Sequence, residues 1–183
     1  IHARNLEDER SRMERVLRFN AEHDFLTKLP NRSSFFQQAN VLLDHVQHHP
    51  AEGEACCLAL IDIDFFKQIN DVYGHLAGDA VLASLAGLLM QAVRSKDLVA
   101  RFGGEEFILL LRGTTLEEAH VIMERTRQLV ERHHFAYQQQ AITVTISVGL
   151  TAYQMGYRRM DDWLQCVDQR LYEAKRRGRN RVA

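Results

Sequence analysis

The sequence has no long run of apolar residues and no excess charge of either sign. No stretch of about 18 consecutive apolar residues occurs, so we expect no membrane-spanning segment. The formal net charge is −1, which argues against a global basic field that would draw the chain to nucleic acid or to an anionic membrane. We therefore expect no nucleic-acid partner. We expect the domain to be cytoplasmic, whether or not the full-length protein is tethered to a membrane.

Cysteine is scarce as well. The three cysteines are Cys56, Cys57 and Cys166, and neither their number nor their spacing suggests a disulfide framework or a zinc site. We predict that they are buried thiols in a reducing compartment. The chain opens with Ile1 and shows no signal-peptide pattern, so we expect it to be a piece of a longer protein.

Proline occurs only twice, and Pro30 marks the first break in the chain. Residues 1–22 are highly charged and contain neither glycine nor proline, and their large apolar side chains fall near a heptad-like stripe. That stripe consists of Leu6, Met13 and Val16 or Leu17. We predict a linker helix over 1–22, either a coiled coil or a lone solvated helix, and one domain over 23–183.

Apolar periodicity predicts the other elements. Helices are expected at 33–48 (capped by Asn31), 79–94, 116–132 and 160–177. Strands are expected at 57–64, 98–102, 106–111 and 142–151, and loops at 50–54 and 71–78. Gly103-Gly104 predicts a tight hairpin between the second and third strands. This order of elements favours an α+β fold with a largely antiparallel sheet flanked by helices.

Acidic residues follow the first strand and the hairpin. Asp62 and Asp64 share one face of the strand end, and Glu105 and Glu106 come directly after the two glycines. Carboxylates beside a core are costly unless they are paired, hydrogen-bonded or metal-bound. Carboxylate oxygens suit Mg²⁺ or Mn²⁺, so the pattern points to a metal-dependent nucleotidyl transferase. The alternative is a set of solvated acids at strand ends.

The hairpin also carries a known signature. The segment Arg101–Phe107 (RFGGEEF) resembles the signature of the GGDEF family in its GGEEF form. Three further segments resemble the family's other motifs in the same order: Asp24–Arg32, Ile61–Asp71 with Gly78-Asp79 after it, and Leu171–Asn180. The resemblance covers residues 24–180. Lys28 stands where glycine is usual, which puts the coupling of a signal in doubt more than the chemistry.

The resemblance implies a ferredoxin-like, palm-type nucleotide cyclase fold and a set of site residues. Two Mg²⁺ or Mn²⁺ ions per half-site would be held by Asp62, the Ile63 carbonyl, Glu105 and Glu106. The catalytic set would be Glu105, Glu106, Asp62 and Lys67. The substrate-binding set would be Asn70 and Asp79 on guanine, Lys175 and Arg179 on phosphate, with Arg101, Phe65 and Phe66. For the lysines and arginines the alternative is ordinary surface charge, and for the two phenylalanines it is packing. We also expect Lys175 and Arg179 to share one face of the last helix.

The activity implied by the resemblance is that of a diguanylate cyclase. Two GTP molecules, one on each protomer of a homodimer, would be joined into cyclic di-GMP, and the leading helix would pair the protomers and carry a signal from an upstream sensory domain outside this fragment. Arg94 and Asp97 match the family's RxxD inhibitory site for the product, with Arg125 as a partner; a surface salt bridge is the alternative. The rival readings are a catalytically silent module that binds GTP or cyclic di-GMP, another palm-type enzyme, and a structural dimerisation module.

Overall fold

The fold is built on a four-stranded antiparallel sheet. The computed structural model describes residues 2–48 and 55–183, so the loop expected at 50–54 lies outside the described residues. The strands stand in the order β2-β3-β1-β6. Their bounds are Cys56–Ile63 for β1, Leu98–Arg101 for β2, Glu106–Arg112 for β3 and Ile146–Ala152 for β6. With helices crossing between β1 and β2 and between β3 and β6, this is the predicted ferredoxin-like α+β arrangement.

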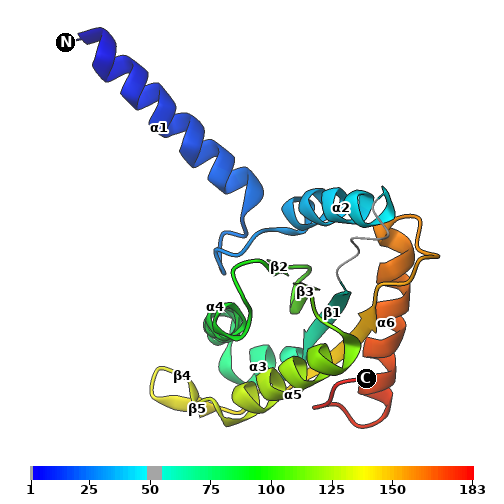
Figure 1. The fold of residues 1–183 in the computed structure, drawn as a ribbon. Helices are drawn as coiled ribbons and strands as arrows, with labels where there is room; N and C mark the ends of the chain where they lie inside the picture. Colours follow the sequence, from blue (N-terminus) through cyan, green and yellow to red (C-terminus); the bar gives the residue numbers. More distant parts are fainter. Residues whose placement is uncertain (1, 49–54) are drawn as a thin grey trace.

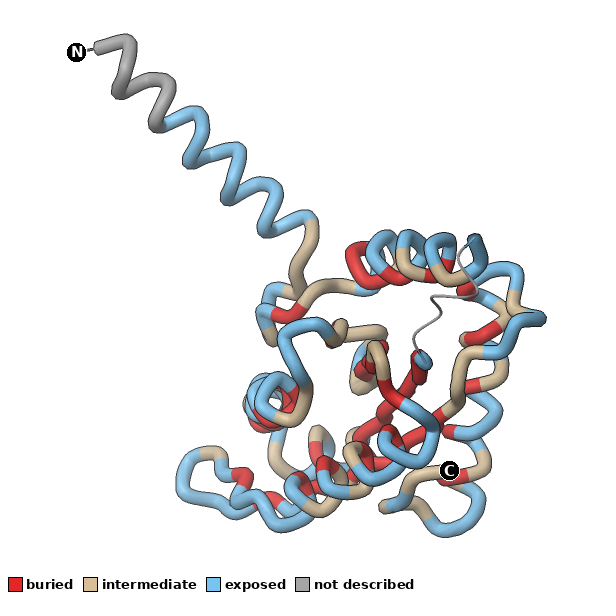
Figure 2. Tube along the Cα trace, viewed as in Figure 1, coloured by how far each residue is buried: buried red, intermediate tan, exposed pale blue. Residues whose placement is uncertain are grey.

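Helices cover both faces of the sheet (Figure 1). Helices α4 (His75–Ala92) and α5 (Leu116–Arg132) lie on one face, and α2 (Arg32–His48) and α6 (Met160–Arg176) lie on the other. Alternate residues of β1 therefore enter two separate apolar clusters, with Ile61 in the first and Leu60 in the second. Figure 2 shows the buried residues concentrated in the sheet and on the helix faces turned toward it. Burial on both faces explains why residues Cys56–Ile61 of β1 form an unbroken apolar run.

Helix α4 is the most apolar of the long helices. In the described part of the chain it is the one helix long and apolar enough to span a membrane by those two measures. Its buried residues, among them Val81, Leu85 and Leu89, enter the larger apolar cluster against the sheet. The apolar character of α4 is thus used within the fold.

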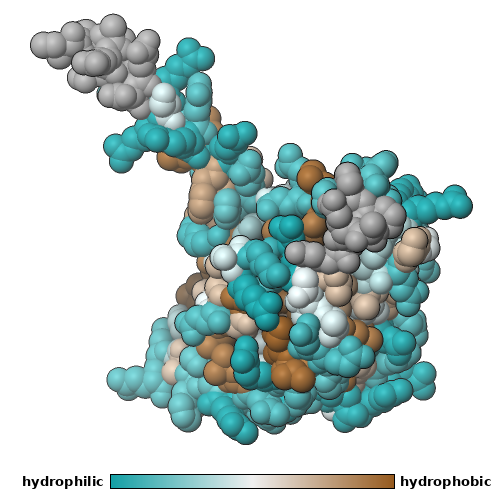
Figure 3. Space-filling view, viewed as in Figure 1, coloured by the Kyte–Doolittle hydropathy of each residue, from teal (hydrophilic) through white to brown (hydrophobic). Residues whose placement is uncertain are grey.

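Helix α1 (His2–Glu22) confirms the helix predicted at the start of the chain. It projects away from the rest of the fold (Figure 1), and its apolar side chains stand among charged ones on an open surface (Figure 3). Met13, Val16, Leu17 and Phe19 are each between 45% and 61% exposed. Ile1, in the predicted linker helix, and the side chain of Leu6, in the predicted stripe, lie outside what the structure describes.

The junction after α1 is held by polar contacts. Asn31 Oδ1 accepts from the backbone N–H of Ser34 (3.0 Å), which confirms Asn31 as the cap of α2, and Asn31 Nδ2 donates to the Ala21 carbonyl (2.7 Å). Lys28 has a φ of 61°. A side chain is costly in this left-handed region, which explains why glycine is usual at this position in the motif.

The region after β1 differs from the prediction. A short helix, α3 (Phe66–Tyr73), overlaps the loop predicted at 71–78, and α4 begins at His75 rather than at residue 79. The helix α3 has eight residues and no side-chain cap. Its apolar face consists of Phe66, Ile69 and Tyr73, which is too short a stripe to establish a helical period in the sequence. Gly78 lies inside α4, although its sequence context indicated a break.

The strand predicted at 142–151 is wrong in its first third. A hairpin of β4 (Phe135–Tyr137) and β5 (Gln140–Ile142) precedes β6, and residues 143–145 are not in a strand. The hairpin turns through Gln138 and Gln139, whose φ values are 46° and 65°. Turns of this kind usually carry Asn-Gly or Asp-Gly, so two glutamines gave no turn signal.

Candidate active site

Two carboxylates face each other where β1 and β3 meet the hairpin. Asp62 lies directly opposite Glu106 in the antiparallel ladder. Ile108 and Leu60, which alternate with them, lie in the cluster under α2 and α6, so both acids point to the side of the sheet that α6 covers. The predicted hairpin is confirmed: the N–H groups of Phe102 and Gly103 both donate to the Glu106 carbonyl (2.8 and 3.2 Å).

The hairpin leaves little space around Glu106. A Cβ on Gly103 would stand 3.0 Å from Glu106 Oε2, whereas a Cβ on Gly104 would meet nothing within 4 Å. A side chain at Gly103 would therefore press on the carboxylate, which would have to shift by a few tenths of an ångström. The second glycine lies exposed at the tip of the hairpin.

The two acids are electrostatically strained. Burial is the main cause that raises the pKa of Asp62, opposed by the Lys175 ammonium, whose Nζ lies 3.0 Å from Asp62 Oδ2. Burial and then repulsion from Asp62 raise the pKa of Glu106. Glu105 adds to the repulsion in both cases. A divalent cation placed here would relieve this repulsion.

The residues present fit such a cation. The N–H of Ile63 donates to the Glu105 carbonyl (3.3 Å), and the return bond from the Glu105 N–H, which a regular ladder would contain, is absent between these two described residues. The Ile63 carbonyl is therefore not used by the hairpin. Within residues 2–48 and 55–183, no three His, Cys, Asp or Glu side chains form a metal-binding set by themselves. Mg²⁺ commonly takes one or two carboxylates and completes its shell with phosphate and water, as this arrangement would require.

Arg101 is held inside the fold. Its Nε donates to the Gly103 carbonyl (3.2 Å), its Nη2 donates to the Gly104 carbonyl (2.8 Å), and its Nη1 pairs with Asp24. The structure thus places this predicted substrate residue as a clamp on the hairpin. Asp24, in the opening motif, was given no role from the sequence.

The residues predicted to bind guanine lie on neighbouring helices. Asn70 is on α3, and Asp79 is exposed in the second turn of α4. A Cβ on Gly78 would overlap with Asn70 Oδ1 and would stand 3.1 Å from the Phe66 ring, so the two helices touch at this glycine. Phe66 packs against the larger apolar cluster, and Lys67 is exposed in the first turn of α3.

The predicted phosphate residues come from α6 and from the loop after it. Lys175 is in the last turn of α6, but this helix ends at Arg176, so the expectation that Lys175 and Arg179 share one helix face is wrong. Arg179 has a φ of 63° beyond Gly178. Its guanidinium lies 4.6 Å from the centre of the half-exposed Phe65 ring. The chain turns at Gly178, and that turn brings Arg179 to the end of β1.

Asp64 is a residue whose role the sequence did not reveal. It is buried, and three donors satisfy its carboxylate: Thr145 Oγ1 (2.8 Å), Ser147 Oγ (2.6 Å) and the backbone N–H of Asn180 (3.0 Å). The two hydroxyl residues precede and begin β6, a segment that carried no motif. Asp64 thus joins the end of β1 to β6 and to the C-terminal loop.

Two of the residues predicted for product inhibition, Arg94 and Asp97, precede β2 and lie at the opposite end of β2 and β3 from the Gly103-Gly104 hairpin. The Asp97 carboxylate accepts from the backbone N–H groups of Arg94 (2.9 Å) and Arg112 (3.0 Å), so it closes the turn before β2. The side chain of Arg94 is exposed, and so is that of Arg125 on α5.

The sequence matches the family described as "Diguanylate cyclase, GGDEF domain" over residues 21–181. Diguanylate cyclase A of Treponema denticola is 40% identical over 162 residues, which cover 87% of this chain and 43% of that protein. Diguanylate cyclase DgcP of Pseudomonas aeruginosa is 40% identical over 178 residues, which cover 97% of this chain and 25% of that protein. The chain therefore spans less than half of the length of either relative.

Solved structures give the same result. The coiled coil and GGDEF domain of DgcB from Caulobacter crescentus, in complex with c-di-GMP, superposes with a TM-score of 0.90 at 28% identity, over 100% of this chain and 94% of that one. The active GGEEF domain of a diguanylate cyclase from Vibrio cholerae gives 0.76 at 33% identity, over 84% and 95%. The family match, the relatives and the fold agree with the motifs, and the chain belongs to the GGDEF family of diguanylate cyclase domains.

Proposed function

We propose that this domain is an active diguanylate cyclase, which condenses two GTP molecules into cyclic di-GMP and two pyrophosphates. The observation that carries the proposal is the pairing of Asp62 with Glu106 across β1 and β3, beside Lys175. The raised pKa values of both acids support a site built for divalent cations. The intact segment Gly103–Phe107 weighs against a silent receptor.

The acidic residues would hold the metal ions and accept the proton of the attacking hydroxyl. Asp62, Glu106 and the Ile63 carbonyl would hold Mg²⁺ or Mn²⁺, with Glu105 as a further ligand. Bound there, the ions would polarise the α-phosphate and lower the pKa of the attacking 3′-hydroxyl. In each transfer that oxygen bonds to the α-phosphorus of the other GTP, and the bond to pyrophosphate breaks. Glu105, partly exposed beside the acids, is placed to take the hydroxyl proton.

The nucleotide would be held from two sides. Asn70 and the exposed Asp79 carboxylate would receive guanine, since Asp can accept from the N1–H and N2–H₂ donors that adenine lacks. Lys67, Lys175 and Arg179 would bind the triphosphate and stabilise the charge of departing pyrophosphate. Lys175 already contacts Asp62, and its ammonium has two further donors for phosphate oxygens.

Each domain would hold one GTP, so the reaction needs two copies face to face. The relative described as containing a coiled coil and a GGDEF domain is similar over the whole chain. The exposed apolar side chains of α1 support pairing of two copies through this helix. We further propose that cyclic di-GMP binds at Arg94 and Asp97 with Arg125 and inhibits the enzyme.

Incubation of the purified protein with GTP and Mg²⁺, followed by nucleotide chromatography, tests the activity. The expected result is cyclic di-GMP and pyrophosphate in a ratio of one to two, with no product in EDTA. Bound GTP that is never converted would instead assign a silent receptor. Conversion of ATP as readily as GTP would contradict the role of Asp79.

A further inference from the structure

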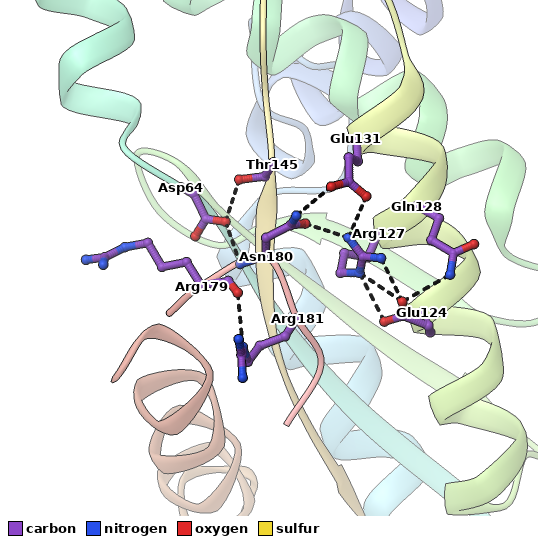
Figure 4. A network of polar contacts seen from close by, with 9 residues as sticks. All are labelled: Asp64, Glu124, Arg127, Gln128, Glu131, Thr145, Arg179, Asn180 and Arg181. Carbon is purple, nitrogen blue, oxygen red and sulfur yellow. Dashed lines mark hydrogen bonds and ion pairs between the residues drawn. The ribbon is translucent and has the colours of Figure 1, made fainter. Parts of the chain in front are cut away.

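Asn180 ends the closing motif, and the proposed chemistry gives it no role. Its backbone N–H donates to Asp64 Oδ2 (3.0 Å), its side-chain nitrogen donates to Glu131 Oε1 (2.7 Å), and its side-chain oxygen accepts from Arg127 Nη1 (2.6 Å). Asn180 therefore connects the end of β1, helix α5 and the C-terminal loop. Figure 4 shows these residues gathered around the Asn180 side chain.

Arg127 is held in place by two carboxylates. Its side chain is only 11% exposed, and its Nε and Nη2 donate to Glu124 (2.7–3.0 Å) while Nη1 donates to Glu131 (2.9 Å). The hydrogen bond from Arg127 lowers the pKa of Glu124, and the hydrogen bond from Asn180 lowers the pKa of Glu131. The guanidinium is planar, with donors in fixed directions. The Glu124 and Glu131 carboxylates fix the orientation of the guanidinium plane. The remaining donor direction of Nη1 therefore fixes where the Asn180 side-chain oxygen can lie.

The network determines where Arg179 points. Arg179 and Asn180 have φ values of 63° and 46°, a left-handed region that Asn tolerates and that is strained for a long side chain such as that of Arg179. Such a conformation persists where surrounding contacts fix it. Here they are the side-chain contacts of Asn180, together with the hydrogen bonds of the Arg179 backbone to the Ala174 carbonyl (3.0 Å) and from Arg181 Nε (3.1 Å). Figure 4 shows the Asn180 side chain directed into the network and the Arg179 side chain extending away from it. The Arg179 guanidinium reaches the Phe65 ring beside the end of β1.

We propose that Asn180 and Arg127 are positioning residues for the GTP triphosphate, and that they act through Arg179. Asn180, Arg127, Glu124 and Glu131 form what we call the C-terminal latch. The latch holds the loop after α6 against α5, so that Arg179 is presented to the phosphates without a further loss of loop entropy on binding. This inference rests on the proposed function, because it requires Arg179 to bind the triphosphate.

The test compares single and double variants by KM for GTP, by kcat, and by the Kd of a fluorescent non-hydrolysable GTP analogue with Mg²⁺. Asn180→Gly removes the side chain but tolerates a positive φ, and Arg127→Ala removes its partner. We expect each to raise KM and Kd about tenfold, the loss of a hydrogen bond to a charged group, with a smaller change in kcat. Thermal unfolding shows that each variant is folded.

Double variants distinguish an effect that passes through Arg179 from a general effect on the stability of the fold. In an Arg179→Ala background, Asn180→Gly and Arg127→Ala should cause no further rise in Kd, because the residue through which they act is gone. Equal effects in both backgrounds, or no effect in either, would overturn the latch. Arg170→Ala is the control: it removes an Arg–Glu pair on α6 (Arg170 Nη1 to Glu173 Oε2, 3.2 Å) that does not include the loop, and it should leave Kd unchanged. Failure of the proposed function would appear separately, as a wild-type protein that makes no cyclic di-GMP.

Discussion

Arg101 Nη1 lies 3.1 Å from both carboxylate oxygens of Asp24, and the same guanidinium holds the carbonyls of Gly103 and Gly104. One side chain thus links the turn after α1 to the hairpin that carries Glu105 and Glu106. The side chains of Arg101 and Asp24 are only 19% and 21% exposed. A shift of the turn relative to the sheet would therefore reach the acids through two residues.

Asp24→Asn should weaken this link in a pH-dependent way. Burial alone would raise the pKa of Asp24, but the hydrogen bonds from Thr27 and Arg101 outweigh it and hold the pKa below its ordinary value of 3.8. The stabilisation is therefore complete above 3.8 and is lost as the pH falls through the lower folded pKa. We expect the variant to be less stable by about 1–2 kcal/mol at neutral pH, with the difference disappearing in acid. Urea unfolding from neutral to acidic pH measures it, and a difference that persists unchanged in acid would contradict the assignment.

Glu106→Gln should remove activity and stabilise the metal-free protein at neutral pH. The folded pKa of Glu106 is raised above 4.5, so its favourable contribution is present below 4.5 and is lost as the pH rises through the folded pKa. Glutamine keeps the shape without the repulsion from Asp62. We expect kcat to fall at least about 100-fold, with a higher melting temperature in EDTA.

Magnesium provides the control for this variant. The wild-type melting temperature should rise when Mg²⁺ and the GTP analogue are added together, since a ligand that binds only the folded state stabilises it. The variant should show a much smaller rise. A wild-type protein that is more stable than Glu106→Gln in EDTA at neutral pH would mean that the two carboxylates do not repel each other.

Gly78→Ala should disturb guanine binding through Asn70. The added Cβ would overlap with Asn70 Oδ1 and press on the Phe66 ring, so the amide must move. We expect KM for GTP to rise more than kcat falls, with a loss of stability of about 1–3 kcal/mol. Gly87→Ala, on the same helix with nothing within 4 Å of its Cβ, should instead stabilise by roughly 0.5–1 kcal/mol. Equal kinetics for the two variants would exclude the effect on Asn70.

Gly78 also shows how far sequence reasoning reaches. The strands and the long helices follow from apolar periodicity, and the pairing of Asp62 with Glu106 follows from the positions of the acids at strand ends. Gly78 predicts a break by composition, yet it lies inside α4. The absence of a side chain at this position leaves room for Asn70. The left-handed positions at Gln138 and Arg179, and the donors to Asp64 from Thr145 and Ser147, depend on long-range contacts. No local pattern encodes such contacts.

Arg94→Ala should abolish product inhibition and leave initial rates near those of the wild type. The Arg94 side chain is exposed and its backbone, not its guanidinium, contacts Asp97, so the turn should persist. Lys96→Ala, in the same turn, is the matched control, and cyclic di-GMP should inhibit this variant as it inhibits the wild type. Asp97 is the poorer target, since its carboxylate also holds Arg112 N–H and its loss would disturb the fold. Initial rates at increasing cyclic di-GMP decide the matter: an Arg94 variant inhibited like the wild type rules the site out.

Leu17→Glu should weaken the pairing of two copies through α1. Met13 and Leu17 are one helical turn apart and 60% and 61% exposed, so they present an apolar surface that a second α1 would bury. A charge there should shift dimers to monomers in sedimentation experiments and lower the activity per protomer at dilute enzyme. Ser11→Glu, which adds the same charge about 200° around the helix from Met13, should change neither. Activity that stays proportional to enzyme concentration in the Leu17 variant would show that the domains meet without α1.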